Sequence, residues 1–213
     1  MGRIFYDITQ TLYPEILVYP GDPAVQITKS SSIARGNIVN LSSISMGSHT
    51  GTHLDAPKHF YDQGVTVDKL PLDYLIGPAK VFEFKKEMSI SKANLQTCSI
   101  QAGDIILLKT RNSALLNRAE FSPDFTYLES DAAEYLAGLP IRTFGFDYLT
   151  IDPHDSADFN AHYHLLGQNI VIIEGLNLSQ ITPGEYQMVA LPLKLQDGDG
   201  SPARVVLIRE ENC

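Results

Sequence analysis

Three of the six histidines in this chain of 213 residues lie within a stretch of eleven residues, and an aspartate lies among them. The four residues are His49, His53, Asp55 and His59. All four have odd numbers, so in an extended chain their side chains would point to the same side. Imidazole nitrogens together with a carboxylate are typical ligands of zinc, and they also suit manganese. The spacing therefore predicts a divalent metal site rather than a set of surface histidines.

A helix is the alternative conformation for this stretch. It would bring His49 and His53 together on one face but would place Asp55 elsewhere on the cylinder. Several residues of the segment disfavour a regular helix: Gly51, Pro57 and the β-branched Thr50 and Thr52. We therefore expect a strand end that runs into a tight loop.

The other histidines lie in the second half of the chain. His162 lies near the start of an expected short helix, and Glu174 ends an apolar strand. A charged carboxylate is seldom buried without a partner, which a metal would provide, but a solvent-exposed strand end explains Glu174 equally well. We expect His154 to lie in a surface turn. His164 follows His162 by two residues, so it would point away from it on a helix and form packing or hydrogen-bond contacts.

Other types of site are less well supported by the sequence. The segment Asp197-Gly198-Asp199-Gly200 resembles part of a calcium loop but lacks the later glutamate, and a hairpin turn explains it more simply. The serines near His49 lack the G-x-S-x-G pattern of a nucleophile. Neither Cys98 nor Cys213 has a histidine or asparagine next to it in sequence, which leaves a thiol nucleophile as a remote alternative.

The composition is ordinary for a soluble globular protein, with 44% hydrophobic and 19% charged residues. A formal net charge of -9 gives no basic surface for nucleic acid or for an anionic membrane. The apolar runs are as short as strands, and the chain does not begin with a secretory signal. Two cysteines exclude a disulfide framework. We therefore expect a protein of the reducing cytoplasm with no nucleic-acid or membrane partner.

The hydrophobic pattern predicts more strands than helices, with short helices interspersed. An α/β fold with one mixed sheet, in a single domain over residues 1–213, follows from this order of elements. Strands are expected at residues 3–9, 25–29, 38–46, 79–84, 104–109, 143–148, 169–174, 188–195 and 203–209. Helices are expected at residues 70–75, 91–97, 130–139 and 160–167, the last three capped by Ser91, Ser130 and Asn160.

The stretch His49-x-Gly51-Thr52-His53-x-Asp55-x-Pro57-x-His59-Phe60 resembles the signature of the cyclase-like metal hydrolases. That family includes bacterial kynurenine formamidase and isatin hydrolase. Weaker matches follow in the same order along the chain: Pro20-Gly21-Asp22, His162 with Leu165-Leu166-Gly167, Glu174, and the run from Asp199 to Arg204. The resemblance thus covers nearly the whole chain.

The resemblance implies a swivelling β/β/α-type fold in a homodimer or higher homo-oligomer, with the site near a subunit interface. It also implies one or two divalent ions, with Zn²⁺ the first choice and Mn²⁺ the alternative. Carried over by position, the metal ligands would be His49, His53, Asp55, His162 and Glu174. His59 would be the general acid and base.

Formamidases of this family that act on formylkynurenine tend to have Trp before the Pro-Gly-Asp element, whereas this chain has Tyr19 and no Trp. Tyr19 is therefore the candidate substrate-binding aromatic residue. The predicted reaction is hydrolysis of N-formylkynurenine to kynurenine and formate, with His59 moving the proton. Ring opening of a cyclic amide or lactone is the closest alternative, and a non-catalytic metal-binding protein is the alternative from another class.

Overall fold

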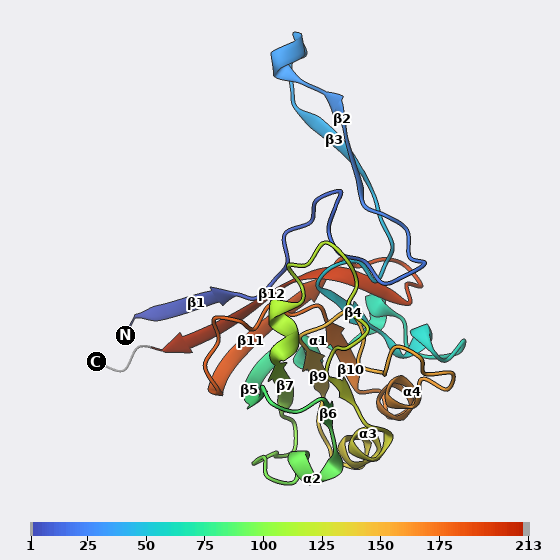
Figure 1. Cartoon of the computed structure of the whole chain (residues 1–213). Coiled ribbons are helices and arrows are strands. Elements are labelled where there is room, and N and C mark those ends of the chain that lie inside the picture. Colours follow the sequence, from blue (N-terminus) through green and yellow to red (C-terminus); the bar gives the residue numbers. More distant parts are fainter. Residues whose placement is uncertain (1, 211–213) are drawn as a thin grey trace.

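The computed structural model describes residues 2–210 and contains one large mixed β-sheet (Figure 1). Its strands follow the order β1-β12-β11-β5-β7-β9-β10-β4. Because β12 also pairs with β4, the sheet closes into a barrel-like ring, and β1 extends it on the outside. The strands are β1 (Arg3–Asp7), β4 (His53–Asp55), β5 (Ile76–Phe84), β7 (Ile105–Thr110), β9 (Thr143–Phe146), β10 (Val171–Glu174), β11 (Gly184–Pro192) and β12 (Gly200–Glu210).

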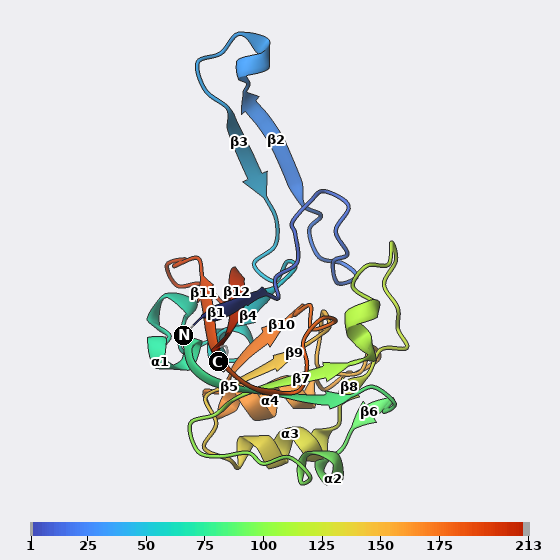
Figure 2. The same cartoon turned by 90° about the vertical axis from the view of Figure 1, so that its left-hand side faces the viewer.

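The remaining elements are short, and most of them lie outside the ring (Figures 1 and 2). The four minor strands are β2 (Gln26–Ser31), β3 (Leu41–Ser45), β6 (Ser89–Ile90) and β8 (Tyr127–Leu128). The α-helices are α1 (Leu72–Leu75), α2 (Lys92–Leu95), α3 (Ser130–Ala137) and α4 (Asn160–Gly167). Single 3₁₀ turns occupy Ile33–Arg35, Pro57–His59, Val67–Lys69 and Arg111–Ala114. The predicted α/β class, with a mixed sheet and short helices, is confirmed.

Side-chain alternation along the central strands divides the hydrophobic core into two parts. On β7, Ile105 and Leu107 point into the ring, where they meet Leu54 of β4. Ile106 and Leu108 point the other way and pack beneath α3 and α4, which cover that face (Figure 2). Both faces of β7 are therefore buried, which explains its continuous apolar sequence.

Two of the three predicted helix caps are wrong. Ser91 does cap α2, accepting a hydrogen bond from the Asn94 backbone in a capping box. Ser130 is instead the first residue of α3, which has no side-chain cap. Asn160 is likewise the first residue of α4 and does not cap it. Phe159 stands at the cap position of α4 with a φ of 45°. The carboxylate of Asp152 accepts hydrogen bonds from the free backbone N–H groups of the helix instead.

The hairpin β2–β3 is separated from the rest of the structure and projects away from the ring (Figures 1 and 2). The strand predicted at residues 38–46 is shorter than expected, because residues 38–40 belong to the turn at the end of this hairpin. The predicted pairing of the last two long strands is confirmed, with β11 and β12 antiparallel and Pro192 opposite Ala203. Among residues 2–210, no helix is long and apolar enough to cross a membrane.

Candidate metal centre

The short strand β4 is the centre of the candidate site. It pairs with β10 on one side and β12 on the other, which places Glu174 opposite His53 and Gly200 opposite Asp55. His53 and Asp55 share one face, whereas Leu54 points into the core. The expected strand end that runs into a tight loop is thus confirmed by β4 and the 3₁₀ turn Pro57–His59.

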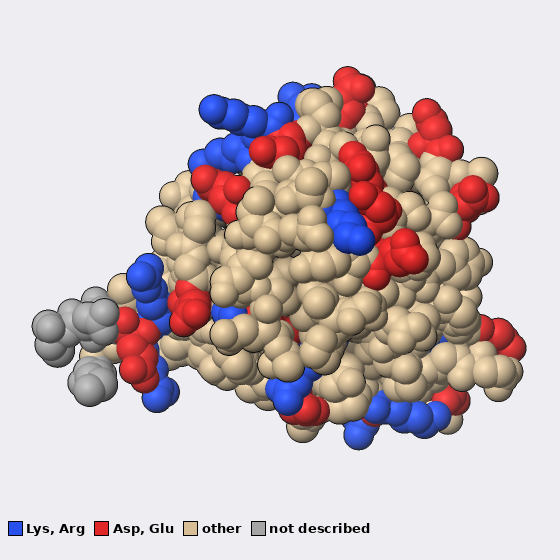
Figure 3. Space-filling view, turned by 90° about the horizontal axis from the view of Figure 1, so that it is seen from below, with Lys and Arg blue, Asp and Glu red and all other residues tan. Residues whose placement is uncertain are grey.

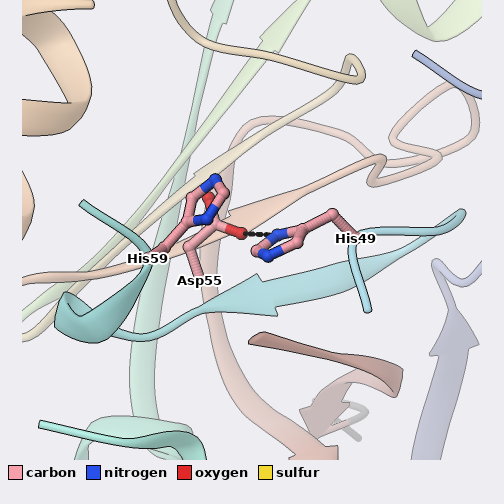
Figure 4. A group of neighbouring side chains, drawn as sticks. All are labelled: His49, Asp55 and His59. Atoms are coloured by element: carbon pink, nitrogen blue, oxygen red, sulfur yellow. Dashed lines mark hydrogen bonds and ion pairs between the residues drawn. The ribbon is translucent and has the colours of Figure 1, made fainter. Parts of the chain in front are cut away.

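Two of the four residues lie outside β4 and reach the site through turns. His49 lies in the loop before the strand, and His59 ends the 3₁₀ turn Pro57–His59 after it. Figure 4 shows both imidazoles directed towards the Asp55 carboxylate. The Nδ1 atom of His49 lies 2.7 Å from Oδ1 of Asp55.

Two glycines allow the loop before β4 to approach the end of β10. Gly51 and Gly175 both have positive φ values, of 65° and 67°. A Cβ atom on Gly175 would overlap the carbonyl oxygen of Gly51. The hydroxyl of Thr52 donates to the carbonyl of Gly175 at 2.7 Å and links the two segments. Glu174 is thereby held beside His53.

The donor atoms form two overlapping groups, each compact enough to surround one ion. His49, Asp55 and His59 make up one group, and His53, Asp55 and Glu174 make up the other, with the atoms of each group within 4.8 Å of one another. Asp55 belongs to both groups and is completely buried. His162 adds to the second group, since its Nε2 lies 3.2 Å from Glu174 Oε1 and 3.6 Å from Asp55 Oδ2.

Two buried oxygen atoms indicate that these residues fit a cation. Asp55 Oδ2 and Glu174 Oε1 have no hydrogen-bond partner among residues 2–210, although both carboxylates are buried. An unpaired buried carboxylate oxygen is costly, and a divalent ion would satisfy it. The donor set of imidazole and carboxylate groups, without cysteine, is compatible with zinc and with manganese.

The electrostatics of the cluster also favour a positive charge between the carboxylates. Burial lowers the pKa of His53, but hydrogen bonds and charge from Asp55 and Glu174 outweigh it and raise the pKa to about 10. Burial raises the pKa of Asp55, but the surrounding imidazoles, His49 first, hold it well below its usual range. Burial is the largest cause of the lowered pKa of His59. His59 is therefore the imidazole of this group that most favours the neutral form.

Each of the three imidazoles nearest the carboxylates has its other ring nitrogen fixed by a separate group. His49 Nε2 lies 3.1 Å from Asp199 Oδ2, and His53 Nδ1 lies 3.0 Å from the carbonyl oxygen of Gly51. His162 Nδ1 lies 2.5 Å from Asp152 Oδ2. Histidine ligands of metals commonly donate their second N–H in this way, which fixes the tautomer and the ring orientation. The remaining ring nitrogens point towards the carboxylates of the site.

Asp152 has a second role that the sequence did not reveal. Its carboxylate accepts hydrogen bonds from the backbone N–H groups of Ala161 and His162, at 2.9 and 3.1 Å. It therefore caps α4 from a loop eight residues earlier while it also holds the imidazole of His162. The run from Asp152 to Asp155 reads as a turn, and nothing in its spacing indicates a contact with the helix. Asp199 was predicted as part of a hairpin turn and of a run that matches the family, but not as a partner of His49.

The site opens into a cavity of about 240 Å³ with largely apolar walls. Tyr19 lines it and packs edge-on against Phe121. Phe60 stacks on the ring of His162, with centroids 4.7 Å apart, and His59 stacks on His49 at 3.9 Å. The other lining residues are Asp22, His53, Leu149, Thr150, Phe159 and Glu174. His59 thus faces the same space as the aromatic walls.

The two histidines predicted to lie outside the site do so. His154 lies in a turn, as predicted, and its side chain is about one-third exposed because its ring packs against Phe121 with a centroid distance of 4.9 Å. His164 lies on the far side of α4 from His162, with its Nε2 3.5 Å from the hydroxyl of Ser130. This contact agrees with the predicted packing or hydrogen-bond role.

The face of the molecule opposite the hairpin has mixed charge (Figure 3). Acidic side chains are spread over this face, and basic ones occur in small separate groups. This distribution differs from the continuous basic surface of a nucleic-acid-binding protein.

Comparison with known proteins agrees with this geometry. The family model described as "Putative cyclase" matches residues 6–153. Kynurenine formamidase of Geobacillus thermodenitrificans is 38% identical over 97% of this chain and 98% of its own length. A predicted metal-dependent hydrolase from Bacillus stearothermophilus is 37% identical, with a TM-score of 0.87 over 99% of this chain and all of that one.

A further similar structure is isatin hydrolase A from Labrenzia aggregata. It is 26% identical, with a TM-score of 0.86 over 98% of this chain and 94% of that chain. The matches extend over almost the whole sequence and include the strands that surround the candidate site. The chain belongs to the cyclase family of metal-dependent hydrolases.

Proposed function

We propose that this protein is a metal-dependent arylformamidase that hydrolyses N-formylkynurenine to kynurenine and formate. The observation that carries the proposal is the pair of donor groups sharing Asp55, next to His59 and an aromatic cavity. Similarity to kynurenine formamidase over nearly the full length of both chains supports the same substrate. We assign the whole of residues 1–213 to this single hydrolase domain.

The ligands of the proposed centre are His49, His53, Asp55, His162 and Glu174. An ion bound there would lower the pKa of water towards about 7 and would polarise a carbonyl group. We favour Zn²⁺ in one or two sites, with Mn²⁺ as the alternative, because both accept imidazole and carboxylate ligands.

His59 is the proposed general acid and base. Its ring lies against His49 and faces the cavity, so it can take the proton of the attacking water. It would then pass the proton to the aryl amine nitrogen as the C–N bond breaks. Tyr19 and Phe60 line the cavity where they would hold the aryl ring and exclude bulk water. Tyr19 thus takes the place of the Trp expected in formylkynurenine-specific relatives.

Opening of a cyclic amide or lactone is the second candidate reaction. Its support is the close structural similarity to isatin hydrolase A, which shares the fold over nearly all of this chain. The third candidate, a metal-binding protein without catalysis, has less support because His59 lies beside the ligands and faces the cavity. We further propose a cytoplasmic location and a homodimer or higher homo-oligomer, as the family resemblance implies.

Turnover of N-formylkynurenine tests the proposal directly. We expect the metal-loaded protein to release formate, the chelated protein to be inactive, and His59→Ala to lose about 10²- to 10⁴-fold in kcat with its metal content unchanged. Full activity of His59→Ala would exclude its proposed role. A folded, metal-loaded protein that opens isatin but leaves N-formylkynurenine intact would favour the second reaction. Unfolding on chelation, without turnover of either substrate, would favour a structural metal.

A further inference from the structure

Three polar groups in the cavity take no part in the proposed chemistry at the metal. They are the hydroxyl of Tyr19, the carboxylate of Asp22 and the hydroxyl of Thr150, and together they are called the polar wall here. None of the three groups has a hydrogen-bond or ion-pair partner among residues 2–210, and none is sealed from solvent. A few polar groups in a largely apolar cavity commonly fix the orientation of a ligand. The polar wall is therefore free to bind a polar part of the substrate.

The charge of the polar wall indicates which polar group it binds. Of the two carboxylates that line the cavity, Glu174 belongs to the donor groups of the metal centre, whereas Asp22 is exposed and lies outside them. In the described part of the chain, no Lys or Arg side chain lines the cavity. A cation on the ligand would find a partner in Asp22, and a second anion there would be repelled. The cavity thus favours a ligand with a positive charge close to Asp22.

The turn that carries Asp22 is stiff before any ligand binds. Pro20 and Pro23 restrict φ on either side of it, and Gly21 has a positive φ of 97°. The backbone N–H of Asp22 donates to the carbonyl oxygen of Tyr19 at 3.0 Å and closes the turn. A group that is already held in place loses little conformational entropy on binding.

The two hydroxyls are the uncharged part of the polar wall. Thr150 lies after β9 and is only 6% exposed. Burial first, and then the charges of Glu174 and Asp22, raise the pKa of Tyr19, so its phenol keeps its proton at neutral pH. A hydroxyl can donate a hydrogen bond to a carboxylate of the ligand, which the Asp22 carboxylate cannot do.

The zwitterion of an α-amino acid matches this combination of groups. At neutral pH its ammonium and its carboxylate are both charged, since their ordinary pKa values are about 8 and about 3.5. N-formylkynurenine carries such an end on a side chain beside its aryl formamide, whereas isatin has no amino-acid end. With the formamide at the metal centre, the amino-acid end is left to meet the other groups of the cavity.

We propose that Asp22 binds the ammonium of the substrate's α-amino-acid end and that the hydroxyls of Tyr19 and Thr150 bind its carboxylate. This inference rests on the proposed function and narrows its substrates to aryl formamides with a zwitterionic side chain. Asp22 is then the residue that separates such substrates from neutral cyclic amides.

Binding of the product to the metal-loaded full chain tests the polar wall without turnover. L-Kynurenine keeps the amino-acid end, and 2-aminoacetophenone is an aryl ketone that lacks it. By calorimetry, we expect the wild type to bind L-kynurenine at least about tenfold more tightly than 2-aminoacetophenone. Asp22→Asn should lose about five- to tenfold in affinity for L-kynurenine and less than about twofold for 2-aminoacetophenone. Tyr19→Phe and Thr150→Val should each lose about three- to tenfold for L-kynurenine.

Two comparisons separate the charge of Asp22 from damage to the fold. Glu15→Gln is the matched control, because it removes an exposed acidic charge from the same loop but outside the cavity. It should bind L-kynurenine like the wild type. Anthranilate carries a carboxylate but no ammonium, so Asp22→Asn should bind it more tightly than the wild type does. A damaged cavity would not produce that gain.

Several results would overturn the proposal. These are equal affinity of the wild type for L-kynurenine and 2-aminoacetophenone, wild-type binding of L-kynurenine by Asp22→Asn, and weaker binding of anthranilate by that variant. Unchanged binding by both hydroxyl variants would remove Tyr19 and Thr150 from the polar wall. Failure of the formamidase proposal is distinguishable, because it would appear as no formate release by a chain that still binds L-kynurenine through Asp22. A chain that releases formate but fails the binding test would keep the proposed function and lose this inference.

Discussion

Two halves of the candidate site reach the same point in space by different routes. The contiguous half, consisting of His49, His53, Asp55 and His59, comes from eleven consecutive residues around one short strand. The distributed half comes from a loop, a helix, a strand end and a turn, and consists of Asp152, His162, Glu174 and Asp199. Both halves include donor atoms, but the distributed half also includes two carboxylates, Asp152 and Asp199, that contact imidazoles at their outer ring nitrogens.

The two halves therefore differ in role: the contiguous half supplies the carboxylate on which ion binding depends, and the distributed half also positions imidazole ligands. Asp55 alone belongs to both groups of donor atoms, so the contiguous half contains the residue on which both proposed ion positions depend. Asp152 and Asp199 instead contact histidines from the side away from Asp55. We therefore expect a change at Asp55 to remove the metal, and changes at Asp152 or Asp199 to weaken its binding in steps.

The largest effect is expected for Asp55→Asn. An amide at this position removes the charge shared by both groups and places N–H donors among imidazoles. We expect metal affinity to fall by more than about 100-fold, beyond the usual loss from an indirect contact, and turnover to fall to background. Metal content after dialysis and formate release are the measurements. Asp62→Asn, an exposed change outside the site, is the matched control. If Asp55→Asn retained tightly bound metal, ion binding by the two groups of donor atoms would not depend on the Asp55 carboxylate.

Asp152→Asn should have an intermediate effect on two separate properties. The carboxylate accepts three hydrogen bonds with its two oxygens, whereas asparagine keeps one oxygen. An oxygen kept at the Oδ2 position would retain both contacts with His162 and lose the bond from Ala161, whereas one kept at Oδ1 would retain only the bond from Ala161. We expect unfolding free energy without metal to fall by about 1 to 3 kcal/mol, and metal affinity to fall about 10- to 100-fold.

Chemical denaturation of the metal-free protein and competition with a metal indicator measure these two effects. Asp155→Asn is the matched control, because its side chain is fully exposed two residues after Pro153. If Asp152→Asn lost stability but bound metal like the wild type, Asp152 would be a helix cap alone. The distributed half would then position fewer ligands than the geometry indicates.

The same division explains which parts of the site could be predicted from sequence. The contiguous half was recognisable because donor residues recur at short intervals beside Gly51 and Pro57, which are visible without a structure. The strand end and the tight loop after it were predicted, but the alternation of an extended chain holds only for His53 and Asp55, because the chain turns before and after β4. His162 and Glu174 came from family resemblance, since the pairing of β4 with β10 is a long-range contact.

Prediction of the fold from sequence also fails where an element depends on long-range contacts. Strand positions followed from apolar runs such as residues 105–108, because a strand that is buried on both faces is apolar at every position. The closure of the sheet by β4 could not be predicted, because β4 has three residues and pairs with strands more than 100 residues away. The cap of α4 was missed for the same reason, since the capping carboxylate of Asp152 is not adjacent to the helix in sequence.

The smallest effect is expected for Asp199→Asn. The Asp199 side chain is 46% exposed and lies 3.1 Å from His49 Nε2, so water can replace part of its contact. We expect metal affinity to fall by about tenfold, the lower end for such contacts, with no change in the unfolding free energy of the metal-free protein. Asp197→Asn is the control in the same turn, because Asp197 contacts Lys69 and not the site. A loss as large as that of Asp152→Asn would mean that exposure does not set the strength of these contacts. A loss equal to that of the control would mean that His49 is oriented by Asp55 alone, and the positioning role of the distributed half would then rest on Asp152.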